Sequence, residues 1–113
     1  MATEIIVTEE FEAWYLALSL SERKAIFRVV SLLEEHGVTL EFPYSSSIKG
    51  SRFAMRELRI QHGGDPYRVL YVFDKTRQAV LLVGGIKTAK GNRWYEAAVR
   101  EADRLFEEYL RGI

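Results

Sequence analysis

Three β-prone segments follow one another in the middle of the sequence, separated by short turns. They are residues 53–60, 67–74 and 79–85. The run Gly63–Pro66 has the composition of a tight turn, and only four residues, 75–78, join the second segment to the third. Parallel neighbours need a much longer crossover connection than these turns provide. The spacing therefore predicts an antiparallel meander of three strands.

The segments before the meander predict a short strand and two helices. Glu4–Val7 is a short β-prone run. Apolar residues then recur at helical spacing through residues 9–36, with Ser21 a candidate cap for the second helix. Gly37 follows as a typical helix stop. We expect these two helices to pack as a hairpin.

The remaining segments complete the predicted architecture. Residues 38–51 are rich in serine and poor in apolar residues, which predicts a loop. Residues 95–110 carry an apolar stripe at helical spacing, which predicts a final helix. The predicted order is β-α-α-β-β-β-α, an α+β fold with an antiparallel sheet packed against helices. Residues 1–113 are expected to form a single domain.

Composition excludes several classes of site. The chain has no cysteine, which rules out disulfides, thiolate metal sites and cysteine nucleophiles. Its two histidines lie in no close cluster with carboxylates, so no metal and no cofactor are expected. No apolar run has the length of a membrane span, and the N-terminus lacks a signal pattern. A soluble, cytoplasmic protein is the expectation.

Charge is unevenly distributed along a chain whose formal net charge is zero. Residues 1–48 hold three basic and eight acidic side chains, and residues 101–113 hold two and four. Residues 49–100 hold eleven basic and four acidic ones, a balance of +7. One face of the predicted sheet can therefore carry a positive field, although neighbouring helices can also neutralise it.

The most basic connection lies between the last strand and the last helix. It contains Lys87, Lys90, Asn92, Arg93, Trp94 and Tyr95. Cations of this kind hold phosphates, and aromatic rings stack on bases. Lys90, Asn92, Arg93 and Trp94 are therefore candidate RNA-binding residues. The alternative is a basic surface loop whose two aromatic residues merely pack the helix onto the sheet.

Strand connectivity brings further cations toward the same end of the meander. Arg59 ends the first strand, Arg68 begins the second, and Lys87 follows the third. Adjacent antiparallel strands place these positions side by side. With Tyr95, they form a candidate catalytic set. The alternative for the two arginines is ordinary pairing with Glu57 or Asp65, and for the tyrosine a packing role.

A cationic pocket of this kind suits attack on a phosphate. Guanidinium and ammonium groups stabilise the negative charge of the transition state. RNA supplies its own nucleophile, the 2′-hydroxyl, so positioning, charge and proton transfer suffice without a metal. The base would be Lys87 or Tyr95, with a pKa lowered by the neighbouring cations.

Several motifs together resemble one known family. The runs Met55–Arg59 and Tyr67–Tyr71, the run Leu81–Thr88, and the later Arg93–Tyr95 are similar to the RelE/ParE toxin superfamily. The similarity is greatest to the HigB-like, phage-derived branch of type II toxin–antitoxin systems. It extends from about residue 5 to residue 110.

The resemblance implies a RelE-like fold and a toxin that cleaves mRNA on the ribosome without a metal. It also implies an antitoxin partner, often a helix-turn-helix protein. By position, Arg68 matches the arginine that stabilises the transition state, Lys87 the basic residue after the last strand, and Tyr95 the aromatic residue at the last helix. Arg59 matches the arginine of the Glu-Leu-Arg run.

Two other functions are compatible with the same resemblance. One is a non-enzymatic inhibitor of DNA gyrase, as for ParE relatives. The other is a catalytically decayed module that keeps only antitoxin binding, which the apolar Ile86 before Lys87 and the zero net charge suggest.

Overall fold

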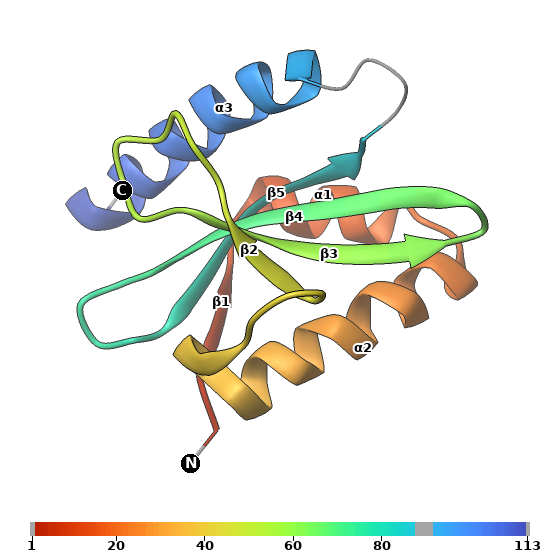
Figure 1. Ribbon diagram of the computed structural model, residues 1–113. Helices are drawn as coiled ribbons and strands as arrows, with labels where there is room; N and C mark the ends of the chain where they lie inside the picture. Colours follow the sequence, from red (N-terminus) through yellow and green to blue (C-terminus); the bar gives the residue numbers. More distant parts are fainter. Residues whose placement is uncertain (1, 88–91, 113) are drawn as a thin grey trace.

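A five-stranded sheet lies between two helical layers in the computed structural model, which describes residues 2–87 and 92–112 (Figure 1). The strand order is β1-β5-β4-β3-β2. Helix α3 covers one face of the sheet, and α1 and α2 cover the other. The bounds are β1 Ile5–Val7, α1 Glu9–Leu16, α2 Leu20–His36, a 3-10 turn Gly37–Thr39, β2 Ser45–Ser47, β3 Arg56–His62, β4 Asp65–Phe73, β5 Ala79–Ile86 and α3 Asn92–Arg111.

The predicted meander and the α+β class are confirmed. Strands β3, β4 and β5 pair antiparallel in sequence order. The expectation of a wholly antiparallel sheet is wrong, because β1 pairs parallel with β5, with Ile5 opposite Ala79. These two strands are not joined by a hairpin, so no turn restricts their relative direction.

A short strand lies inside the segment predicted to be a loop. Strand β2 pairs antiparallel with β3, with Ser45 opposite Leu58. The buried hydroxyls of Ser45 and Tyr71 share a hydrogen bond of 2.5 Å, which satisfies both polar groups in the core. Serine has little β preference, so the strand depends on this pairing rather than on its own sequence.

The helix ends follow capping chemistry. Helix α2 is capped by Ser19 and not by Ser21, because Ser19 and Glu22 form a reciprocal capping box. Helix α3 begins at Asn92, three residues before the predicted start. No helix among the described residues is long and apolar enough to cross a membrane.

Alternation along β4 divides the core into two clusters. Val69 and Tyr71 pack toward α1 and α2, whereas Leu70 and Val72 pack toward α3. Arg68 has the same parity as Leu70 and Val72, so its side chain belongs to the α3 side. The cations predicted from the meander therefore face α3.

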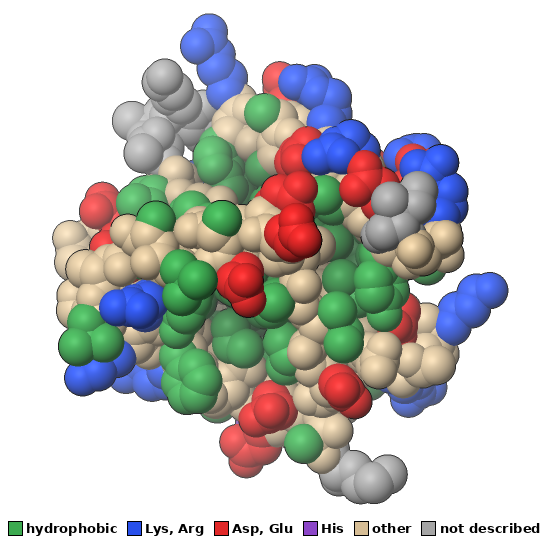
Figure 2. Space-filling model, turned by 180° about the vertical axis from the view of Figure 1, so that it is seen from behind, with side chains coloured by type: hydrophobic (Ala, Val, Ile, Leu, Met, Phe, Trp, Pro, Cys, Tyr) green, Lys and Arg blue, Asp and Glu red, His purple; other side chains and the backbone are tan. Residues whose placement is uncertain are grey.

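Exposed apolar side chains gather on the side of α1 and α2. Val7, Leu16, Leu20 and Phe27 are between 42% and 63% exposed, and a hollow of about 280 Å³ lies among the elements that carry Val7, Leu16 and Phe27. Figure 2 shows hydrophobic side chains gathered on the rear face, next to acidic ones. This surface lies across the sheet from the cations of β3 and β4.

Candidate active site

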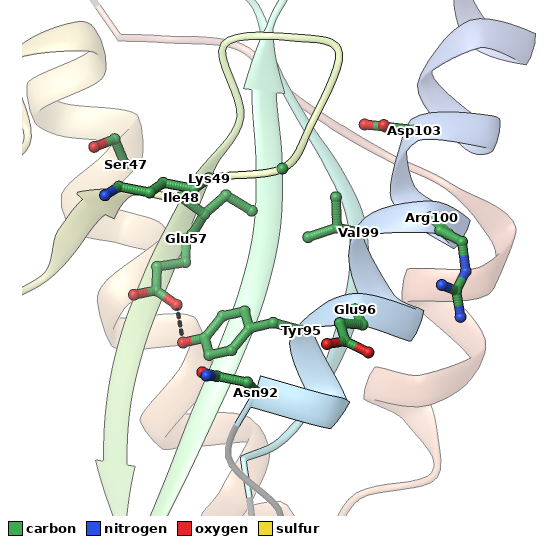
Figure 3. A pocket seen from close by; sticks show the side chains of 11 residues that line it. Ser47, Ile48, Lys49, Glu57, Asn92, Tyr95, Glu96, Val99, Arg100 and Asp103 are labelled. Carbon is green, nitrogen blue, oxygen red and sulfur yellow. Dashed lines mark hydrogen bonds between the residues drawn. The ribbon is translucent and has the colours of Figure 1, made fainter.

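A buried carboxylate, Glu57 of β3, lies at the centre of the candidate site. Its side chain is 5% exposed. One carboxylate oxygen accepts the hydroxyl of Tyr95, and the other accepts Ser46 Oγ at 2.8 Å and Arg59 Nη1 at 3.0 Å. Figure 3 shows Glu57 and Tyr95 pointing toward each other from β3 and α3. The α3 helix thus brings its tyrosine directly onto the sheet carboxylate.

The two predicted arginines are neighbours on the same face of the sheet. Arg59 and Arg68 are directly opposite each other in the β3–β4 register. Both contact Glu57, with Arg68 Nε 3.5 Å from its Oε1 atom. The pairing with Glu57, which the sequence left open as the alternative for the two arginines, is therefore present. A strand carboxylate lies between the guanidinium groups and lowers the electrostatic cost of placing them together.

Arg68 is almost entirely buried, with 6% of its surface exposed. Its Nη1 atom donates to the carbonyl oxygen of Tyr67 at 2.9 Å. Its Nε–H has no hydrogen-bond partner within the described part of the chain. A buried donor without a partner costs free energy, and the Glu57 carboxylate 3.5 Å away offsets part of that cost electrostatically.

Lys87 lies at the same end of the sheet, as its connectivity predicts. Its backbone N–H donates to the carbonyl oxygen of Pro66 at 2.8 Å, which extends the β4–β5 pairing by one residue. Its ammonium nitrogen is 5.4 Å from the centroid of the Tyr95 ring. The structure therefore brings all four candidate catalytic residues together: Arg59, Arg68, Lys87 and Tyr95.

Tyr95 has a raised pKa, which contradicts the predicted direction. Burial is the largest cause, the hydrogen bond to Glu57 is next, and Arg68 opposes both. Burial and the carboxylate therefore outweigh the nearby cations. The phenol stays protonated at neutral pH, so Tyr95 is suited to donating a proton rather than to acting as the base.

The candidate RNA-binding residues that the structure describes lie together at the start of α3 but differ in burial. Trp94 packs with the α3-side core, and its indole lies over Gly85, where a Cβ atom would come within 2.6 Å of Nε1. This contact supports a packing role for Trp94 over base stacking. Asn92 and Arg93 are exposed at the start of α3. Lys90 lies outside the described residues.

A groove of about 600 Å³ opens beside Glu57 and Tyr95. It runs between the chain around Lys49 and one side of α3 (Figure 3). Lys49, Asn92 and Glu96 supply polar groups along it, and all three are exposed. Glu57 and Tyr95 both border this space, and the Glu57 side chain exposes only 5% of its surface.

From the sequence, Glu57 was expected only as an ion-pair partner of the arginines, and its central place in the site was not predicted. The signal was present, because strand alternation puts Glu57 and Arg59 on one face and Leu58 and Ile60 on the other. Among the described residues, no three His, Asp or Glu side chains come together as a metal site. The chemistry open to these side chains is proton transfer by a carboxylate and a phenol beside fixed positive charge.

Sequence comparison identifies similar proteins over most of the chain. Residues 13–107 match the family described as phage-derived protein Gp49-like. Two Mycobacterium tuberculosis proteins are similar: one named "Putative toxin HigB2" is 35% identical over 104 residues, and one named "Putative toxin HigB3" is 36% identical over 107. The alignments cover 90% and 94% of this chain. They span about half of the first protein (52%) and 92% of the second.

Two solved structures have the same fold at low sequence identity. Escherichia coli toxin RelE, solved as a mutant in the free state, superposes with a TM-score of 0.61 at 16% identity over 88% of this chain and 97% of RelE. The archaeal RelE–RelB complex from Pyrococcus horikoshii gives 0.58 at 17% identity over 79% of this chain and 99% of the matched chain. The RelE-like fold is therefore confirmed.

Proposed function

Because the chain belongs to the phage-derived Gp49-like family and is homologous to proteins named as HigB toxins, we propose that it is a type II toxin that cleaves RNA. The observation that carries this proposal is the convergence of Arg59, Arg68, Lys87 and Tyr95 around Glu57. Three cations and one carboxylate leave the cluster with net positive charge, as binding of a phosphate requires.

The residues divide the cleavage chemistry among themselves. Glu57 takes the proton from the ribose 2′-hydroxyl, whose oxygen forms a bond to phosphorus. The bond from phosphorus to the 5′-oxygen breaks, and Tyr95 donates a proton to that leaving oxygen. Arg59, Arg68 and Lys87 stabilise the charge on the phosphate oxygens. The products are a 2′,3′-cyclic phosphate and a 5′-hydroxyl.

The hydrogen bond between Tyr95 and Glu57 restores the starting state. After cleavage, Glu57 is protonated and Tyr95 is ionised. The proton returns along their hydrogen bond from the carboxyl to the phenolate, so neither group depends on exchange with bulk water. The cycle uses no metal and no cofactor.

Inducing the protein in a bacterium tests the proposal. We expect growth to stop and mRNA to be cut, and we expect Arg68→Ala to relieve both effects. Arg77→Ala is a suitable control, since Arg77 is exposed in the β4–β5 turn, away from the site. An unaffected culture with intact mRNA would refute the nuclease function, and a supercoiling assay would then test gyrase inhibition.

We further propose that the substrate is mRNA on the ribosome. The open groove beside Glu57 accepts a single strand but offers few cations of its own, which favours a substrate that another particle holds in place. Cleavage in a translating extract should exceed cleavage of the same purified mRNA by orders of magnitude. Equal cleavage rates for mRNA in the extract and for purified mRNA would show that cleavage does not require the ribosome.

The proposed partner is a cognate antitoxin, expected to be a helix-turn-helix protein. Homology to proteins named as toxins supports this assignment. Co-expression of the protein encoded next to this chain should restore growth and co-purify with it. A neighbour that neither binds nor protects would contradict the assignment.

A further inference from the structure

Two residues with exposed aromatic side chains lie beside Arg59, in the turn that leads into β2. Phe42 is 72% exposed, and its ring centroid is 5.3 Å from the Arg59 guanidinium carbon. Tyr44 is 45% exposed, and its carbonyl oxygen accepts the Arg59 backbone N–H at 2.8 Å. Neither side chain belongs to the two core clusters of the described residues.

The Phe42 ring adjoins the face of the sheet that carries Glu57, and Tyr44 lies next to it at the edge of β2. Ser45 bonds to Tyr71 on the α1 and α2 side, whereas Ser46 bonds to Glu57 on the α3 side. Tyr44 immediately precedes β2, and its carbonyl oxygen accepts the backbone N–H of Arg59, so it lies next to that residue. Phe42 reaches this side through its contact with Arg59.

Arg59 joins these rings to the reaction centre. One of its nitrogens is 3.0 Å from Glu57, while its guanidinium carbon lies over the Phe42 ring. A strand whose phosphate contacts Arg59 therefore has an exposed aromatic surface at the adjacent nucleotide. Base–aromatic stacking next to a guanidinium is the usual way in which proteins hold single-stranded nucleic acid.

We propose that Phe42 and Tyr44 form a stacking platform for an unpaired base of the RNA strand, next to the scissile phosphate. This inference rests on the proposed nuclease function. It assigns base stacking to the β2 edge, whereas the sequence predicted Trp94, whose ring is packed against Gly85.

Binding of a non-cleavable RNA tests the platform separately from catalysis. The probe is a short, fluorescein-labelled, single-stranded oligonucleotide with 2′-O-methyl riboses, which lacks the nucleophile. We expect Phe42→Ala to weaken binding roughly 5- to 100-fold and Phe42→Trp to retain it. Phe27→Ala is the matched control, because Phe27 is 63% exposed but lies on the other side of the sheet.

Cleavage of mRNA in a translating extract is measured for the same variants. If the wild type cleaves mRNA and Phe42→Ala binds and cleaves equally well, the platform is overturned and the nuclease proposal stands. If the wild type does not cleave mRNA, the nuclease proposal is overturned. If Phe42→Ala still weakens oligonucleotide binding in that case, the platform is supported as an RNA-binding site without cleavage. A Phe42→Ala variant that binds RNA normally but loses its antitoxin assigns the rings to a protein partner and overturns the proposal.

Discussion

In the proposed mechanism, Glu57 is the base. Its side chain accepts from a phenol, a serine hydroxyl and a guanidinium, and it is almost fully buried. Glu57→Gln keeps the size of the side chain and removes the proton acceptor. We expect cleavage to fall about 10²- to 10⁴-fold, measured as the initial rate of mRNA cutting.

Glu96→Gln provides the comparison for that variant, since Glu96 lines the same groove but is exposed. It should cut at close to the wild-type rate. If Glu57→Gln also stays within a few-fold of wild type while it remains folded, Glu57 has a purely structural role, as the counter-ion of Arg59 and Arg68.

Substitution of Tyr95 tests the second proton transfer, in which the phenol protonates the leaving oxygen. Tyr95→Phe keeps the ring under the Lys87 ammonium group and against Trp94, but removes the proton. We expect a clear loss of cleavage with little change in folding. Because burial raises the pKa of Tyr95, the wild-type donor should persist above pH 10, the ordinary tyrosine range. Wild-type cleavage rates in Tyr95→Phe would exclude the phenol as the donor.

At the scale of elements, two adjacent glycines of β5 govern the packing of two different helices. A Cβ atom on Gly84 would come within 2.2 Å of the Trp14 ring of α1, and one on Gly85 within 2.6 Å of the Trp94 ring of α3. Both tryptophans would have to move. Only the second movement also displaces Tyr95, the next residue of α3.

Gly84→Ala and Gly85→Ala therefore form a matched pair. Each should lower the free energy of unfolding by about 1–3 kcal/mol through overpacking. We expect Gly85→Ala alone to reduce cleavage by tenfold or more, assayed at a temperature where thermal melts show both variants folded. Equal activities per folded molecule would mean that the docking of α3 through Trp94 does not position the site.

The same scale shows what the sequence could and could not predict about the fold. The meander was predictable because its apolar alternation and its short turns allow few pairings. Strand β2 was not, since its three serines carry no β signal and depend on the hydrogen bond to Tyr71. The parallel pairing of β1 was also missed, because nothing local to Ile5–Val7 encodes its distant partner β5.

At the scale of the whole molecule, chain connectivity explains why the convergence of the site was predictable and its electrostatics were not. The register of the meander brings Arg59, Arg68 and Lys87 to one end, a consequence of topology alone. The pKa of Tyr95 depends instead on burial under α3 and on a carboxylate from β3. This burial exists only once the helix has packed on the sheet. The sequence shows mainly cations near Tyr95, and it therefore suggests that the pKa of Tyr95 is lowered, whereas the folded structure raises it.

A hydrogen bond between β4 and the start of α2 is expected to make the stability of the fold depend on pH. The hydroxyl of Tyr67 on β4 donates to Glu22, which also caps α2. This bond raises the pKa of Tyr67 to about 12 and lowers that of Glu22. A raised tyrosine pKa means that the stabilisation is complete below about pH 10 and disappears as the pH rises through about 12. On the acid side, the contribution of Glu22 is lost as the pH falls through its lowered pKa.

Tyr67→Phe should therefore be less stable than the wild type at pH 8 and should lose less stability between about pH 10 and 12. Urea unfolding across this range measures the difference between the two curves. Tyr44→Phe is the control, since Tyr44 is 45% exposed and its hydroxyl makes no hydrogen bond to the described residues. Its curve should parallel that of the wild type. If Tyr67→Phe runs parallel as well, the bond from Tyr67 to Glu22 does not couple the layers, and packing between α2 and β3 must hold them together instead.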